Sequence, residues 1–236
     1  MLFRSDVTLE KDRYNELIEP FWNWLETGYS TLRRISVLGG EPFLLDDFHR
    51  LLDFIETHPN QNLQLSIISN IMVKSEILEN FVNTTKKLLS KRHLGSVEIL
   101  VSVDCWGPQQ EYIRYGLDLK EFVFNMEYLL DKNVVLCMNA AINGLSIKTM
   151  PDLIRKFAEW NQQRSVYINF QTVTVPSFMN PDIFGSGVFA DDLFDCLDIF
   201  PKNDEHNSLS YDYLLGISKQ LNNCVINLAE RSEEHT

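Results

Sequence analysis

The chain has 236 residues, 44% of them hydrophobic and 11% aromatic, which is enough for one sizeable core and argues against general disorder. Its 33 acidic residues outnumber the 21 basic ones and give a formal net charge of −12, and no cluster of Lys and Arg interrupts this excess. This balance disfavours duplex nucleic acid and anionic membranes as partners and favours a small molecule or a peptide.

The chain has no sequence feature of a membrane or secreted protein. Its apolar runs are too short to cross a bilayer, and residues 1–6 lack the hydrophobic core of a signal peptide, so we expect a cytoplasmic location. The four cysteines lie far apart and fit neither a zinc ribbon nor a small disulfide scaffold; they are Cys105, Cys137, Cys196 and Cys224. We expect them to be buried free thiols.

Helical and strand patterns alternate along the chain. Residues 12–26 predict an amphipathic helix with one apolar stripe, formed by Tyr14, Leu17, Ile18, Phe21, Trp24 and Leu25. Further helices are predicted at 44–58, 75–89, 118–130, 149–160, 190–200 and 211–221, and strands at 35–38, 63–68, 97–103, 134–142 and 166–175. The stretch 104–108 is expected to be turn-rich, 178–187 to be loop, and 231–236 to be a solvated tail.

The regular alternation predicts parallel strands joined by helices. No Gly-x-Gly-x-x-Gly turn is present, which disfavours a dinucleotide-binding sheet and favours an α/β fold in the form of a partial (β/α) barrel. We expect the barrel core to occupy residues 1–176 and a C-terminal helical extension and tail to occupy residues 177–236.

Candidate site residues follow the predicted strands, because a parallel barrel has its chemistry at the carboxyl ends of its strands. Gly39, Gly40, Glu41 and Pro42 end the first apolar run, where glycine permits close approach of the backbone and the proline favours extended geometry at Glu41. The other strand-end residues are Ser69, Asn70, Ser102, Asp104, Asn139 and Gln171. Each one alone can equally be a turn residue or a helix cap.

Gly39–Pro42, Ser69-Asn70, the Ser-x-Asp at 102–104 and the stretch Glu111–Gly116 together resemble the core of radical S-adenosylmethionine (SAM) enzymes of the SPASM or twitch branch, over about residues 14–176. The resemblance implies that Glu41 binds the ammonium group of SAM and that Arg114 contacts its carboxylate. Arg114 in a surface ion pair with Glu111 or Asp118 is the alternative. The residues Ser69, Asn70, Ser102 and Asp104, and less directly Asn139 and Gln171, would bind the sugar or line the substrate cavity.

The chain departs from this family at its metal centre. The family holds a [4Fe–4S] cluster on a Cys-x-x-x-Cys-x-x-Cys loop after the first strand, and this sequence has no such loop. The expectation is therefore a radical-SAM-like partial barrel whose first strand and cluster loop are missing, as in a truncated chain or, alternatively, a cluster-free descendant. The intact protein would cleave SAM to a 5′-deoxyadenosyl radical that abstracts hydrogen from a peptide, a protein or a small molecule, and an electron donor would reduce the cluster.

Two other function classes remain open. A barrel hydrolase could use Glu41 and Asp104 as acid and base, and a non-catalytic barrel could bind a nucleoside cofactor or a partner protein. A histidine-ligated metal hydrolase is disfavoured, because every histidine lies on a predicted helix, loop or tail; these are His49, His58, His93, His206 and His235.

Overall fold

The computed structural model describes residues 11–202 and 205–223. The helices are α1 (Lys11–Gly28), α2 (Asp46–Thr57), α3 (Ser75–Ser90), α4 (Pro108–Ile113), α5 (Leu119–Leu130), α6 (Met150–Gln163), α7 (Ala190–Ile199) and α8 (Glu205–Asn223), and five short 3-10 turns connect them to the strands. The strands are β1 (Arg34–Val37), β2 (Asn60–Ser69), β3 (Leu94–Ser102), β4 (Val135–Ile142) and β5 (Tyr167–Thr172). Within this part of the chain, no helix is both long enough and apolar enough to cross a membrane.

The structure confirms the predicted α/β alternation. The five strands form one sheet in the order β1-β2-β3-β4-β5, with β1 parallel to β2 and β4 parallel to β5. Strands that follow one another in the chain are thus neighbours in the sheet, which is compatible with part of a (β/α) barrel. Several boundaries differ from prediction: β2 and β3 begin earlier, at Asn60 and Leu94, and β5 ends at Thr172. In addition, 108–113 is helical, and α8 begins at Glu205 instead of near residue 211.

The chain divides into two compact units, Met1–Leu100 with Phe124–Val135 and Val101–Val123 with Leu136–Thr236. We describe each unit by itself. The proposed division into residues 1–176 and 177–236 stays a prediction.

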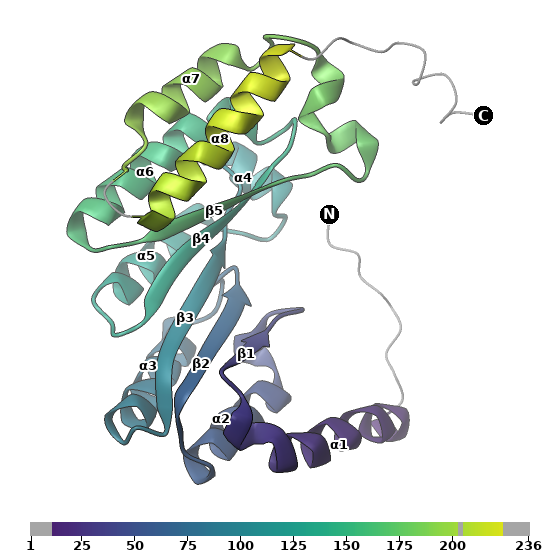
Figure 1. Cartoon of the computed structure of the whole chain (residues 1–236), viewed down its shortest axis with the longest axis vertical. Coiled ribbons are helices and arrows are strands. Elements are labelled where there is room, and N and C mark those ends of the chain that lie inside the picture. Colours follow the sequence, from purple (N-terminus) through teal and green to yellow (C-terminus); the bar gives the residue numbers. More distant parts are fainter. Residues whose placement is uncertain (1–10, 203–204, 224–236) are drawn as a thin grey trace. The chain divides into compact units, whose positions relative to one another are not determined.

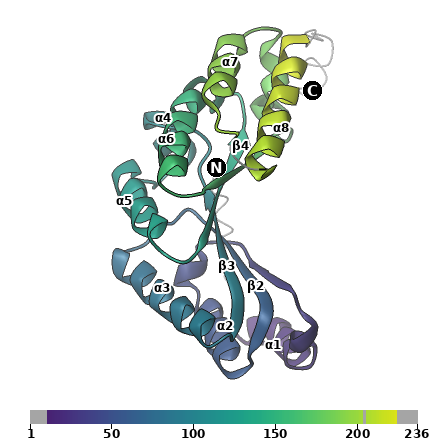
Figure 2. The same cartoon turned by 60° about the vertical axis from the view of Figure 1, so that its left-hand side comes forward.

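In the first unit, the middle of β2 has three completely buried apolar side chains on its helix-covered face, Leu63, Leu65 and Ile67. Figures 1 and 2 show α3 running along β2 and β3. On the opposite face a charged network crosses three strands. Nη2 of Arg34 lies 2.7 Å from Oε2 of Glu98, and the hydroxyl of Ser66 donates to the same oxygen at 2.8 Å.

In the second unit, α7 packs against both α6 and α8, and α8 packs on β5 (Figure 1). The side chains of α8 bind the outer edge of β5. Asn207 and Ser210 donate to the backbone carbonyls of Val166 and Ile168, and Tyr213 accepts from the backbone N–H of Thr172. The first turns of α8 are polar, and their side chains form hydrogen bonds to the strand. Hydrophobic periodicity cannot indicate such contacts, so the predicted helix began too late.

The predicted helix α1 is present, but most of its predicted apolar stripe is exposed. Trp22 and Leu25 are buried, and the Trp22 ring lies 6.2 Å from the ring of Phe54 on α2. Four apolar side chains of the predicted stripe are exposed instead, namely Tyr14, Leu17, Phe21 and Trp24. Helix α1 is therefore covered along the side that carries Trp22 and Leu25.

Candidate functional site

The loop after β1 contains two consecutive glycines in an unusual backbone conformation. Gly39 has φ +99° and Gly40 has φ +56°, two consecutive conformations that side chains rarely adopt. A Cβ added at either glycine would meet no atom within 4 Å, so the backbone here is open to approach. Glu41 is extended, as predicted for a residue before proline, and Pro42 begins a 3-10 turn.

The two carboxylate oxygens of Glu41 differ in their hydrogen bonds to the described residues. Its Oε1 accepts from the hydroxyl of Ser69 at 2.7 Å and from the backbone N–H of Phe43 at 3.4 Å. Its Oε2 is buried and accepts no hydrogen bond from the described residues. Burial raises the pKa of Glu41, although the Ser69 hydroxyl and the nearby backbone N–H groups of Phe43 and Asn70 act in the opposite direction. The hydrogen bonds therefore do not fully offset the cost of burying the ionised carboxylate, and a bound cation could stabilise it.

Ser69 and Asn70 shape the loop after β2. The Ser69 hydroxyl, besides donating to Glu41, accepts from the backbone N–H of Ile71 at 2.8 Å, and the side-chain oxygen of Asn70 accepts from Met72 N–H at 2.9 Å. Ile71 has φ +52°, a strained conformation for a β-branched residue. Both predicted residues thus have local turn roles, and Ser69 also positions the candidate carboxylate.

A buried amide on α5 stabilises this strained loop. The side-chain nitrogen of Asn125 donates to the carbonyl of Ile71 at 2.8 Å and to that of Val73 at 3.0 Å. Asn125 is 1% exposed, so these carbonyls have no ready access to solvent donors in its absence. The sequence analysis missed Asn125, although an amide on the same helix face as Phe122 and Met126 is a recognisable signal.

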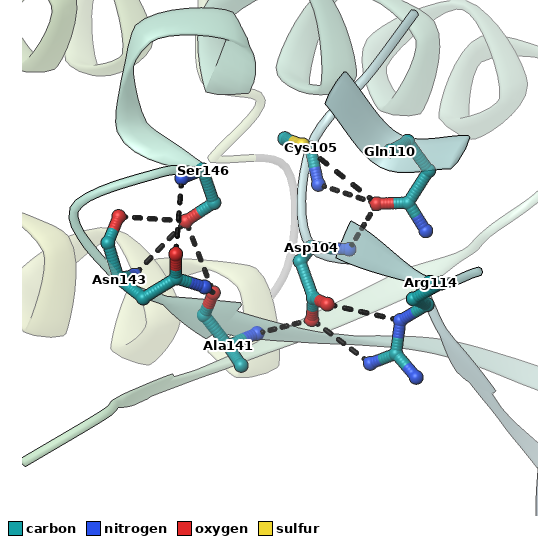
Figure 3. Close-up of polar contacts among 7 residues, drawn as sticks. All are labelled: Asp104, Cys105, Gln110, Arg114, Ala141, Asn143 and Ser146. Carbon is teal, nitrogen blue, oxygen red and sulfur yellow. Dashed lines mark hydrogen bonds and ion pairs between the residues drawn. The ribbon is translucent and has the colours of Figure 1, made fainter. Parts of the chain in front are cut away.

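In the second unit, Asp104 is the centre of a polar network at the end of β3 (Figure 3). Nη2 of Arg114 donates to its Oδ1 at 2.9 Å, and Nε of Arg114 lies 2.9 Å from Oδ2 in an ion pair. The backbone N–H of Ala141 on β4 also donates to Oδ1, at 2.9 Å. Asp104 and Arg114 are thus brought together as two predicted residues, and Arg114 pairs with neither of the partners expected for it on the surface.

Gln110 on α4 completes the network and was not predicted. Its Oε1 accepts from the backbone N–H groups of Asp104 at 3.0 Å and Cys105 at 3.1 Å (Figure 3). Gln110 is fully buried, and its Nε2 has no hydrogen-bond partner among the described residues. The short helix α4 is therefore fastened to the end of β3 by two side chains four residues apart, Gln110 and Arg114.

The remaining predicted residues lie on the strands of the second unit. Ser102 ends β3 and is half-buried, and Asn139 on β4 is half-buried with its carbonyl accepting from Val103 N–H at 3.2 Å. Gln171 is exposed on β5, in register with Ala141. The predicted residues therefore form two groups, one per unit: Gly39–Pro42 with Ser69 and Asn70, and Ser102, Asp104 and Arg114 with Asn139 and Gln171. That both groups contribute to one site at the carboxyl ends of the strands stays a prediction.

No group of three or more metal-ligating side chains occurs among residues 11–202 and 205–223. Cys105, Cys137 and Cys196 are buried free thiols, as predicted, and Cys224 lies outside the described residues. Burial raises the pKa of Cys105 to about 11 and that of Cys196 to about 12, so neither is poised as a thiolate ligand.

Comparison with known proteins adds no family to these observations. No model of a known protein family matches the chain, and no curated protein matches it.

Proposed function

We propose that this chain is a radical-SAM-type core that binds S-adenosylmethionine, with Glu41 as the acceptor for the ammonium group of its methionine part. The observation that carries the proposal is the buried Oε2 of Glu41 in the loop after β1, an acceptor to which no described residue donates. An ammonium group has three N–H donors and a positive charge, so it would satisfy the orphan oxygen and stabilise the ionised carboxylate.

The surroundings of Glu41 fit such a ligand. Ser69 fixes the orientation of the carboxylate through Oε1. Oε2 could therefore accept a ligand hydrogen bond with little further loss of side-chain entropy. The positive φ angles of Gly39 and Gly40 leave their backbone free of side-chain cover, which would let the ligand approach the chain closely.

That Arg114 contacts the SAM carboxylate stays a prediction from the family resemblance, because Arg114 and Glu41 belong to different units. Arg114 uses Nε and Nη2 on Asp104, and its side chain is 31% exposed, so Nη1 is the atom that would serve a ligand carboxylate. Asp104 would then be a positioning residue that holds the guanidinium. Ser102, Asn139 and Gln171 are the weaker members of the proposed site.

The described residues do not fit a [4Fe–4S] cluster. Three thiolates would have to converge on one centre, and the buried cysteines of the described chain form no such group. We therefore derive no step through the cluster. Reductive cleavage of SAM, a peptide or small-molecule substrate and an electron donor remain predictions from the family resemblance.

A hydrolase that pairs Glu41 with Asp104 is less well supported. A general acid or base must be able to exchange a proton with the substrate, and the carboxylate of Asp104 is occupied by Arg114 and by the N–H of Ala141.

Titration calorimetry with SAM tests the proposal. Glu41→Gln keeps an acceptor for Ser69 but removes the charge, and it should weaken SAM binding about 10- to 100-fold, the effect of losing a hydrogen bond to a charged group. 5′-Methylthioadenosine lacks the amino-acid part, so its binding should be insensitive to this substitution. Glu56→Gln is the matched control, because Glu56 pairs with Lys87 and Lys91 on the helix surface.

The affinity should also depend on pH in a stated direction. Because burial raises the pKa of Glu41, its carboxylate becomes protonated at a higher pH than an ordinary glutamate, and SAM affinity should fall as the pH is lowered through that value. Unchanged SAM affinity in Glu41→Gln, or an equal loss for 5′-methylthioadenosine, would refute the ammonium contact.

A further inference from the structure

A series of hydrogen bonds joins a buried side chain on α5 to the candidate carboxylate. The side-chain nitrogen of Asn125 donates to the carbonyl of Ile71 at 2.8 Å, and the backbone N–H of Ile71 donates to the hydroxyl of Ser69 at 2.8 Å. That hydroxyl donates in turn to Oε1 of Glu41 at 2.7 Å. These four residues, here called the Asn125 path, all belong to the first unit.

The path fixes the direction in which Ser69 donates. A serine hydroxyl has one hydrogen to donate and can also accept. Because the Ser69 oxygen accepts from the backbone N–H of Ile71, the hydroxyl hydrogen is left for Glu41. A serine side chain that accepts from the N–H two residues further on forms a local turn, and Ile71 has φ +52° in this turn.

Asn125 holds the turn in this conformation. A positive φ is strained for a β-branched residue and persists only where the surroundings impose it. The side chain of Asn125 donates to the carbonyl of Ile71 and, at 3.0 Å, to that of Val73, and so fastens the backbone at Ile71 and two residues beyond it. Without these two bonds the backbone at Ile71 would relax toward an ordinary φ, and its N–H would turn away from Ser69.

The same path decides which oxygen of Glu41 the protein itself uses. The Ser69 hydroxyl and the backbone N–H of Phe43 both donate to Oε1, and no described residue donates to the buried Oε2. Contacts that fix the carboxylate through Oε1 therefore keep Oε2 available.

We propose that Asn125 is a positioning residue for Glu41, which acts through Ile71 and Ser69 to keep the protein's own donors on Oε1 and to leave Oε2 for a ligand. The identity of that ligand rests on the proposed function, whereas the path itself does not. A purely structural role of Asn125 would change the free energy of unfolding and leave the ionisation of Glu41 as it is.

An NMR titration of the side-chain carboxyl carbon of Glu41 in the full chain tests the proposal, and Glu41→Gln identifies the resonance. The Ser69 hydroxyl and the nearby backbone N–H groups lower the pKa of Glu41, so weakening these contacts should raise it. Asn125→Ala should raise the pKa by about 0.5–1, in the same direction as Ser69→Ala. Asn125→Leu lacks the donors but fills the buried space, so it should raise the pKa in the same way without opening a cavity.

Asn60→Ala is the matched control. Asn60 is another buried amide of the first unit, and its side-chain nitrogen donates to the carbonyls of Tyr29 at 3.1 Å and Leu32 at 3.0 Å. This substitution removes the same kind of contact from a different loop, so it should destabilise the fold and leave the titration of Glu41 unchanged.

The Ser69→Ala background shows whether Asn125 acts through Ser69. Asn125→Ala should raise the Glu41 pKa less in that background than in the wild type, because the path is already broken. Three results would each overturn the proposal: folded Asn125 variants with the wild-type pKa, an equal shift in Asn60→Ala, or an undiminished shift in the Ser69→Ala background. The titration contains no SAM, so its result is independent of the calorimetric test of the proposed function.

Discussion

The ion pair between Asp104 and Arg114 should contribute more to stability than any surface pair in the second unit. The Asp104 side chain is 5% exposed and that of Arg114 is 31% exposed. Removing one partner of a buried pair costs about 3–5 kcal/mol, since the other charge is left uncompensated. Water reaches part of the guanidinium, so Arg114→Ala should lower the free energy of unfolding by about 3 kcal/mol, the low end of that range.

The double-mutant cycle gives a prediction of sign as well as size. Asp104→Asn keeps an acceptor for Ala141 N–H but removes the charge, and it should cost about 2 kcal/mol in the wild type. In the Arg114→Ala background the same change removes an orphaned buried charge and should be neutral or stabilising. The coupling energy of the cycle is then about 2 kcal/mol or more, within the range for residues in one network.

Urea unfolding followed by circular dichroism measures these values, provided that the denaturant slopes of the four proteins agree. The matched control is the pair of Asp152 and Arg155 on α6, whose side chains are 56% and 52% exposed. Its coupling should stay below about 0.5 kcal/mol. If Asp104→Asn costs as much in the Arg114→Ala background as in the wild type, the two residues are not coupled and the reasoning fails.

Two further predictions concern buried groups. Asn125→Ala should lower the free energy of unfolding by about 2 kcal/mol, because two loop carbonyls lose their donor; a change below about 0.5 kcal/mol in urea unfolding would contradict the role assigned to this amide. Cys105 and Cys196 should resist alkylation by iodoacetamide at about pH 8, since their pKa values are raised to about 11 and about 12. Peptide mass spectrometry of native and unfolded protein checks this, and rapid native labelling of either thiol would show that it is not buried.

Much of the fold could be predicted, because the helical or strand-like spacing of apolar residues is visible within short stretches of the sequence. Strands such as β2 have buried residues at every second position, and the glycines and polar residues that follow them mark their ends. Strand ends also predicted Glu41 and Ser69 as site residues, and the structure places the Ser69 hydroxyl on the Glu41 carboxylate.

The parts that were not predicted depend on contacts between distant residues. In the sequence, Gln110 is an ordinary polar residue. Its role depends on the fold, in which the backbone N–H groups of Asp104 and Cys105 donate to its side-chain oxygen. The burial of α1 could not be predicted for a related reason. Periodicity shows that a helix has an apolar side, but which side chains are covered, here Trp22 and Leu25, depends on contacts with distant residues such as Phe54.

The attachment of α8 to the outer edge of β5 gives the sheet a fixed end. A strand that joined β5 would need the carbonyls of Val166 and Ile168 and the N–H of Thr172, and Asn207, Ser210 and Tyr213 already occupy them. Exposed strand edges recruit other chains into aggregates, and side-chain pairing blocks that route here. These three contacts therefore occupy part of the edge that β5 would offer to another strand.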